Sequence, residues 1–171
     1  MNPSASPSSP SGDLLTVYRH SLLARYTDQV DALGSDVEAV SDADRRRPLA
    51  PGEWSPHEVV WHVDAVESQV YQVRLARLVE EEHPLLADFD LEGWMAAHYT
   101  DQESTDAIVA RIAQGRRTMR RRLEQVPVAA WGRTGFHSRW GTRTLMWWVE
   151  RSISHLTEHA RQLRGSQAAG Q

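Results

Sequence analysis

Two histidines near the C-terminal end of the sequence are spaced so that they can bind one ion. His155 and His159 lie four residues apart in a segment with apolar residues at helical spacing, so both imidazoles leave the same helical face. A third histidine, His62, lies between Val59 and Val66 on the inward face of an earlier expected helix. Three imidazole nitrogens with a fourth position left open are typical of catalytic zinc sites.

A structural role explains the same spacing. With eight histidines in 171 residues, an i,i+4 pair also arises by chance, and His155 and His159 would then be a partly buried, hydrogen-bonded pair. Buried polar groups that lack partners cost about 1–3 kcal/mol each, and either a divalent ion or hydrogen bonds would meet that need. The spacing alone leaves both interpretations open.

Two residue types are missing from the chain. The sequence contains no cysteine and no lysine, because all 19 basic residues are arginine. This excludes disulfides, a thiolate nucleophile of the protein's own, Cys-based zinc fingers, iron–sulfur ligation and lysine Schiff bases. Histidines, carboxylates and hydroxyls remain as the groups that can do chemistry.

The charge balance argues against nucleic acid as a partner. Twenty-three acidic residues outnumber the 19 arginines and give a formal charge of −4. The arginine runs at 45–47 and 116–122 are therefore expected to be solvated helix faces. No apolar run approaches the roughly 18 residues of a membrane span, so no membrane partner is expected.

Four long helices and almost no strand are expected between two short tails. The helices span about 13–40, 55–82, 104–125 and 142–165, and their amphipathic spacing predicts an all-α four-helix bundle. The second begins with Ser55 as N-cap, Pro56 at the first position and Glu58 at the third, a capping box. The predicted inward residues are Leu14, Tyr18, Leu22, Tyr26, Val30, Leu33 and Val37; Val59, Val63, Val66, Val70, Val73 and Arg77; Ala107, Ile108, Ile112, Met119 and Leu123; and Leu145, Trp148, Val149, Ser152, Leu156, Ala160 and Leu163.

The connections and termini complete the expected organisation. The link at about 83–103 is long enough to cross over the bundle, and links of this length often carry function. Residues 1–12 form a Ser/Pro-rich tail expected to be disordered, 13–164 the bundle, and 165–171 a flexible C-terminal tail. The N-terminal segment does not resemble a signal peptide, which predicts a cytoplasmic location.

Several further side chains are candidates for a substrate pocket. Trp94 and Trp140 fall in the connecting segments, and Arg116 is a candidate for binding a substrate anion if it points inward. His137 is a candidate ligand or proton relay, although an exposed loop histidine is the simpler interpretation. The other histidines are expected at the surface or partly buried: His20, His57, His83 and His98.

Three blocks of the sequence, in order, resemble the DinB/YfiT-like superfamily. The segment 51–67, PGEWSPHEVVWHVDAVE, resembles the second-helix motif of that family. The segment 155–163, HLTEHARQL, is similar to its H-x-x-x-H-x-x-Q-hydrophobic ending, and the linker 136–142, FHSRWGT, fits as well. The resemblance covers about 13–164.

The resemblance implies a bundle of up-down-down-up topology with a long helix 2–3 crossover, and a homodimer. It assigns His62, His155 and His159 as ligands of a divalent transition metal, with zinc or nickel expected. Relatives include thiol-dependent S-transferases and isomerases. The expected function is therefore a metal-dependent transferase, or a hydrolase-like enzyme, that activates a low-molecular-weight thiol or water for attack on a small-molecule substrate. The alternative is a non-catalytic, metal-stabilised helical-bundle dimer with a binding or stress-response role.

Partner side chains are also expected around the ligands. Glu58 lies one turn before His62, and Ser152 and Gln162 lie close to the other two histidines, so these three are candidates for orienting the imidazoles. For Glu58, capping alone is an equally good interpretation.

Overall fold

Four long helical rods build the protein, as the sequence predicted. The computed structural model describes the backbone of residues 10–169 and the side chains of 14–164. Residues 1–9 and 170–171 of the two predicted tails lie outside the described part of the chain. The rods are α1 (Pro10–Glu38), α2 (Pro56–Val66) continued through a π-helical turn (Glu67–Tyr71) into α3 (Gln72–Glu80), α5 (Thr105–Glu124) and α6 (Leu145–Ala169).

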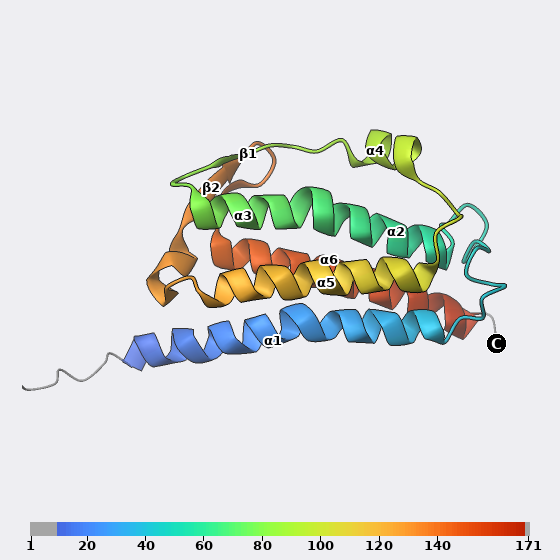
Figure 1. Cartoon of the computed structure of the whole chain (residues 1–171), viewed down its shortest axis with the longest axis horizontal. Coiled ribbons are helices and arrows are strands. Elements are labelled where there is room, and N and C mark those ends of the chain that lie inside the picture. The colour runs from blue at the N-terminus through green and yellow to red at the C-terminus, as the bar shows by residue number, and fades with distance from the viewer. Residues whose placement is uncertain (1–9, 170–171) are drawn as a thin grey trace, which may run out of the picture.

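The rods pack as a four-sided bundle. Helix α1 packs against α5 and α6, and the α2–α3 rod packs against the same two helices. Helices α1 and α6 run in one direction, whereas α2–α3 and α5 run in the other (Figure 1). The two helices that follow each other across the long link therefore point the same way. No helix in the described chain is both long and apolar enough to cross a bilayer.

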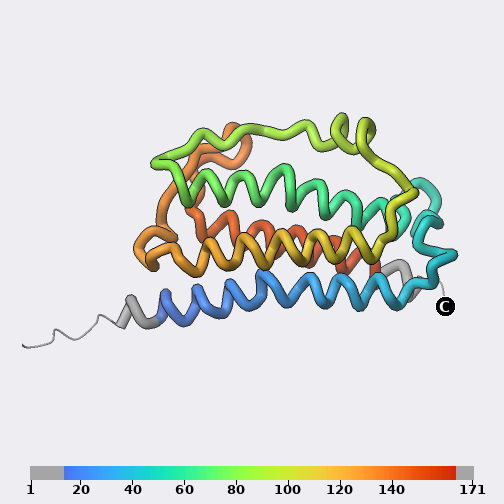
Figure 2. The backbone as a smooth tube through the Cα atoms, viewed as in Figure 1, coloured from blue at the N-terminus to red at the C-terminus, as the bar shows by residue number. Residues whose placement is uncertain are grey.

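The long link travels the length of the bundle before α5 begins. It leaves α3, passes over the outside of the α2–α3 rod and returns to the starting end of α2 (Figure 2). It carries a two-residue strand, β1 (Leu85–Leu86), and a short helix, α4 (Leu91–His98), which packs on α2. Asp90 caps α4 by accepting a hydrogen bond from the Gly93 amide at 2.9 Å.

A small sheet, which the sequence analysis did not predict, closes one end of the bundle. Strands β2 (Thr134–His137) and β3 (Gly141–Thr144) form an antiparallel hairpin, and β1 pairs in parallel with β2. A 3₁₀ turn, Val128–Gly132, connects α5 to the hairpin. Strands of two to four residues are too short to establish a period-2 pattern, which is why composition and spacing did not reveal them.

The start of α2 forms as predicted. The Ser55 hydroxyl accepts a hydrogen bond from the Glu58 amide at 3.2 Å, and the Ser55 amide donates to the Glu58 carboxylate at 2.7 Å. Both halves of the capping box are therefore present, with Pro56 at the first helical position. This cap orients a valine-rich helix of modest intrinsic propensity.

A wide turn shifts the buried face of the second rod. The π-helical turn Glu67–Tyr71 holds one residue more than an α-helical turn. The sequence spacing predicted Val73 as an inward residue beyond this point, and that prediction is wrong because Val73 is 49% exposed. The extra residue advances the inward face by one position, so the buried residues are Tyr71 at the end of the turn and Leu75 and Leu78 beyond it.

The predicted core is confirmed along most of the other rods. All the predicted inward residues of α6 are buried, from Leu145 to Leu163. In α1, Leu14 and Tyr18 are exposed instead. The first turns of α1 extend past the other rods (Figure 1), whereas Tyr18 lies at the rim of the bundle, where its hydroxyl donates to Glu150 on α6. The buried apolar residues form two clusters, one at each end of the bundle.

Candidate metal centre

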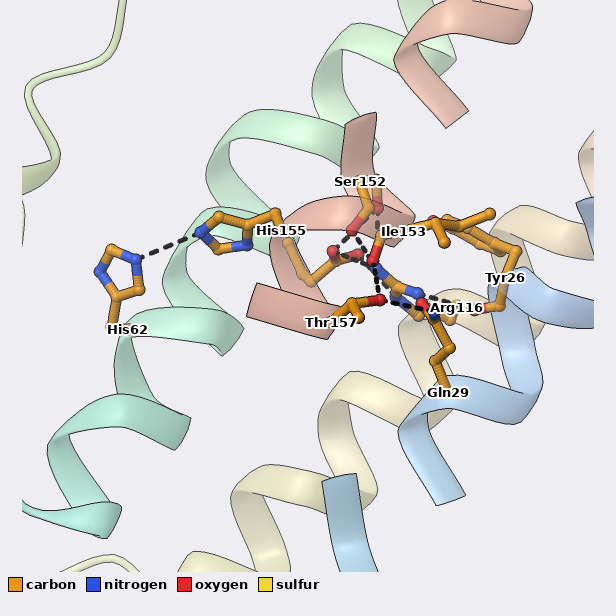
Figure 3. A network of polar contacts seen from close by, with 9 residues as sticks. Tyr26, Gln29, His62, Arg116, Ser152, Ile153, His155 and Thr157 are labelled. Atoms are coloured by element: carbon orange, nitrogen blue, oxygen red, sulfur yellow. Dashed lines mark hydrogen bonds and ion pairs between the residues drawn. The ribbon is translucent and has the colours of Figure 1, made fainter. Parts of the chain in front are cut away.

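Helices α2 and α6 bring three histidines together. The Nε2 atoms of His62 and His155 are 3.3 Å apart, and Figure 3 shows the two rings facing each other between the helices. His159 joins them, with one ring nitrogen from each of the three residues lying within 4.8 Å of the others. The predicted spacing on α6 and the predicted inward position on α2 therefore converge on a single point.

The cluster is held in its neutral form. Burial, together with the nearby His159, lowers the pKa of His62 to about 4. Burial followed by the two neighbouring histidines lowers the pKa of His155 to about 2. Burial also lowers the pKa of His159, although its hydrogen bond to Gln162 opposes that effect. Neutral imidazoles with free lone pairs are the form that binds metals.

Gln162 selects the tautomer of His159. The His159 Nδ1 atom is 3.0 Å from the Gln162 Oε1 atom, an acceptor, so Nδ1 carries the proton and Nε2 keeps its lone pair. The Nδ1 atoms of His62 and His155 are buried and have no hydrogen-bond partner among the described residues.

The distances within the histidine cluster, like its neutral charge state, fit a bound metal ion. Two nitrogen ligands on one tetrahedral ion, each about 2.0–2.1 Å from it, are about 3.3–3.4 Å apart. The 3.3 Å between the Nε2 atoms of His62 and His155 matches that separation. Among the described side chains, no carboxylate belongs to the group, so three histidines would leave at least one coordination position open.

A pocket of about 480 Å³ opens beside His62. Helix α4 and the start of α2 form its walls, which are mainly apolar and aromatic, and Trp54 lies against His62 with ring centroids 4.8 Å apart. Its lining residues are Trp54, Glu58, His62, Leu91, Glu92, Met95, Ala96 and Tyr99. One histidine of the cluster, His62, therefore lines a cavity large enough for a small molecule.

Of the predicted partner residues, Gln162 contacts a histidine of the cluster directly. Glu58 lines the pocket, but its Oε2 atom accepts hydrogen bonds from the Ser55 amide and hydroxyl, each at 2.7 Å. Ser152 contacts none of the three imidazoles; its hydroxyl donates to the Glu67 carboxylate at 2.9 Å.

Arg116 points inward, as the sequence analysis considered, but it does not line the pocket. Its side chain is fully buried and pairs with Glu67, with Nη2–Oε1 and Nε–Oε2 distances of 2.6 and 3.1 Å. The anion that Arg116 binds is thus a carboxylate of the protein. Glu67 is not among the predicted site residues, although opposite charges within the apolar stripes of two helices are a signal of such a pair.

Two other pocket candidates lie in the small sheet, away from the cluster. His137 is 1% exposed, so it is not a surface loop histidine; its Nε2 atom lies 2.8 Å from Arg74 Nη2 and 3.2 Å from Asp88 Oδ1. Trp140 lies in the turn between β2 and β3 and packs on Trp147, with ring centroids 5.8 Å apart. Neither residue lines the pocket beside His62.

The remaining aromatic candidate lies close to the pocket. Trp94 follows the lining residue Leu91 by one turn on α4, but its ring packs on Trp61 and His98, with centroid distances of 5.1 and 4.6 Å. His57, expected at or near the surface, is fully buried, because its ring nitrogens bond to the Tyr99 hydroxyl at 3.0 Å and the Glu103 carbonyl at 2.9 Å.

Comparisons with known proteins agree with this fold. The family model that matches the chain, described as the DinB superfamily, covers residues 22–163. The structure is similar to that of YfiT from Bacillus subtilis, described as a probable metal-dependent hydrolase with an unusual four-helix bundle topology. The TM-score is 0.68 at 19% identity, over 95% of this chain and 93% of YfiT. It is also similar to the four-helix bundle protein TT2238, with a TM-score of 0.62 at 20% identity over 86% of this chain and 98% of the other. A search of curated proteins by sequence finds no match.

Proposed function

The chain belongs to the DinB superfamily, and on this premise we propose that it is a metal-dependent enzyme acting on a small molecule. His62, His155 and His159 would hold a divalent transition-metal ion, with zinc or nickel expected, since imidazole suits both. The 3.3 Å Nε2–Nε2 separation and the lowered pKa values of the three side chains support this ligand set.

One observation carries the catalytic part of the proposal. His62 is both a member of the cluster and a wall of the 480 Å³ pocket, so a substrate in the pocket would lie beside the ligands. A purely structural metal site is closed by four protein ligands. Among the described residues, by contrast, the cluster has three.

The proposed reaction is the transfer of a low-molecular-weight thiol to a small electrophile. The three histidines would hold the metal ion, which, when bound, would supply a nucleophile near neutral pH by lowering the pKa of a thiol or water in its open position. The chain has no cysteine, so the thiol must come from a co-substrate. The chain's own contribution is positional: Gln162 fixes the His159 tautomer, and the mainly apolar and aromatic walls would hold the electrophile beside His62.

Hydrolysis, with water as the nucleophile, is the second candidate. The observation that favours it is the structural likeness to YfiT, which is described as a probable metal-dependent hydrolase. The same ligands and pocket would serve both reactions, so they differ only in the nucleophile.

Metal analysis followed by an activity screen tests the proposal. We expect purified protein to contain one equivalent of metal per chain and the His159→Ala variant to lose most of it, whereas His20→Ala, at an exposed position on α1, keeps it. The metal-loaded protein is then incubated with electrophiles in the presence of several thiols and with water alone.

Each outcome selects between the candidates. Thiol-dependent turnover supports the transferase, and turnover without thiol supports the hydrolase. Full metal content in His159→Ala would show that the ligand assignment is wrong. Metal binding without any turnover would favour the non-catalytic, metal-stabilised dimer. The homodimer and the cytoplasmic location stay predictions, and the exposed Leu14 and Val17 offer apolar surface on α1 for a second copy.

A further inference from the structure

A buried ionic layer lies one turn away from the histidine cluster. It consists of Glu67, Arg116 and Ser152, all of which are 0% exposed, and the backbone carbonyl of Tyr26. Arg116 donates to both Glu67 carboxylate oxygens, to the Tyr26 carbonyl at 2.8 Å, and to the carbonyl and hydroxyl of Ser152 at 3.0 and 2.8 Å. Figure 3 shows Arg116 near Ser152 and Tyr26, with His155 between this group and His62.

The layer joins all four rods of the bundle. Glu67 belongs to the π-helical turn of the second rod, Arg116 to α5, Ser152 to α6 and Tyr26 to α1. The layer lies between the two apolar clusters of the core. On α5, Met119 follows Arg116 by one turn and belongs to one cluster, whereas Ile112 precedes Arg116 by one turn and belongs to the second cluster. The core is therefore apolar at both ends and ionic in the middle, at the level of the candidate metal centre.

Stability alone does not account for this layer. Desolvating two charges costs several kcal/mol per ion, and replacing a buried ion pair by apolar residues of similar volume is often neutral or stabilising. Apolar side chains can slide past one another, whereas a guanidinium with directed bonds to three other rods has only one register that satisfies them. The layer is therefore suited to fixing how α6 lies against the second rod.

The layer lies close to the proposed metal ligands, where the register of α6 against the second rod sets the distance between His62 and His155. Glu67 follows His62 by five residues, and it begins the π-helical turn. Ser152 precedes His155 by three residues on α6. A shift of α6 by about 1.5 Å, the rise of one residue, would separate the facing Nε2 atoms of His62 and His155.

We infer that Glu67, Arg116 and Ser152 are positioning residues that set the distance between the metal ligands of the two helices. This inference rests on the proposed function, because it assumes that the histidines bind a metal. The three residues touch neither the ligand nitrogens nor the pocket; they act through the helices that carry His62 and His155.

A charge-neutral double variant tests the inference. Glu67→Leu with Arg116→Met removes the ion pair without leaving a buried charge, so the metal-free variant is expected to unfold at a temperature equal to or above that of the unaltered chain. Its affinity for zinc, measured by competition with a chelator, is expected to fall about 10-fold or more, as for outer partners of metal ligands. The visible spectrum of the cobalt-loaded variant is expected to change, because the ligand geometry is altered.

A matched pair at the surface serves as the control. Arg122 and Glu80 also join α5 to the second rod, at 2.5 Å, but their side chains are 38% and 62% exposed. Glu80→Gln with Arg122→Gln should leave both the zinc affinity and the cobalt spectrum unchanged. Ser152→Ala provides a milder second variant, expected to keep the fold and to weaken zinc binding by less than the double variant does.

The outcomes separate this inference from the proposed function. If the unaltered chain binds no stoichiometric zinc or cobalt, the proposed function is wrong and the inference falls with it. If the unaltered chain binds metal and the double variant binds it equally well with the same cobalt spectrum, only the inference is wrong. Should the double variant fail to fold, an unchanged zinc affinity in Ser152→Ala would contradict the inference instead.

Discussion

At the scale of single residues, the hydrogen bond from His159 to Gln162 has the clearest consequence. The Gln162 Oε1 atom accepts a hydrogen bond from His159 Nδ1–H, with 3.0 Å between the two heavy atoms. This bond keeps the Nε2 lone pair of His159 available and fixes the plane of the ring. Gln162→Leu removes the acceptor, so we expect metal affinity to fall about 10-fold, at the lower end of such effects. Competition with a chelator measures the metal affinity of the variant and of the unaltered chain.

The matching variant at this position is Gln162→Glu, which keeps an acceptor at the same place and adds a negative charge near the ligands. Its metal affinity should equal or exceed that of the unaltered chain. If Gln162→Leu and Gln162→Glu weaken binding equally, the side chain acts by filling space and not by orienting His159.

The candidate site could be predicted from the sequence only where residues on one helix or in one motif define it. His155, His159 and Gln162 share one helix, so their relative positions follow from helical spacing. Glu67 and Arg116 are 49 residues apart, and nothing local shows that they pair. The sequence therefore predicts for Arg116 a solvated helix face or a substrate anion, and for His137 an exposed loop position or a role as ligand or proton relay, because the partners that bury both residues come from other elements.

At the scale of elements, the N-cap of α2 is expected to influence metal binding. Ser55 and Glu58 form both bonds of the capping box, and His62 lies in the second turn after it. Ser55→Ala should cost about 1 kcal/mol of unfolding free energy, and it should also weaken metal binding because the first turns of α2 fray. Urea denaturation and metal titration measure the two effects.

Ser104→Ala is the control for this prediction. Ser104 caps α5 by accepting a hydrogen bond from the Ala107 amide at 3.1 Å, and α5 carries none of the three histidines. It should lower the unfolding free energy by a similar amount and leave metal affinity unchanged. Equal losses of affinity in both variants would mean that global stability, and not the start of α2, governs binding.

Helix starts could be predicted because capping is local, whereas the π-helical turn could not. The valine spacing from Val59 to Val73 is a regular α-helical pattern, and no residue in it marks an inserted position. The turn forms in the tertiary context: it directs Glu67 towards Arg116 and buries Tyr71 in place of Val70. Tertiary contacts, and not the local spacing of the valines, therefore determine which residues of α3 face inward.

At the scale of the whole molecule, the four-helix bundle is predictable because burying four amphipathic stripes leaves few alternatives. The small sheet and α4 are not predictable, because their strands and helix are short. Strand β1 and helix α4 lie in the long link that passes over α2–α3, whereas β2 and β3 lie between α5 and α6. That link also builds the pocket, because α4 supplies the lining residues Leu91, Glu92, Met95 and Ala96. The three histidines proposed as metal ligands are thus encoded in two long helical rods, and the cavity beside His62 is built partly by the segment that is hardest to predict.

Keeping the histidines neutral makes the stability of the metal-free protein depend on pH. The pKa values of His62 and His155, about 4 and 2 in the folded chain, lie below the ordinary value of 6.5 expected after unfolding. Between pH 6.5 and 4 the unfolded chain binds more protons, so stability is fully present above pH 6.5 and falls as the pH decreases. Each of the two histidines lowers the free energy of unfolding by at most about 1.4 kcal/mol for each pH unit of this decrease.

The measurement is urea denaturation of the metal-free protein at several pH values from 7 to 4, compared with a His62→Gln, His155→Gln variant. Burial also lowers the pKa values of His137 and His159, so some pH dependence remains in the variant. The unaltered chain should lose more stability than the variant over this range, because only in the unaltered chain are two imidazoles forced to stay neutral. Parallel curves for the two proteins would show that the His62 and His155 imidazoles accept protons in the folded chain as readily as in the unfolded one, which would contradict the lowered pKa values.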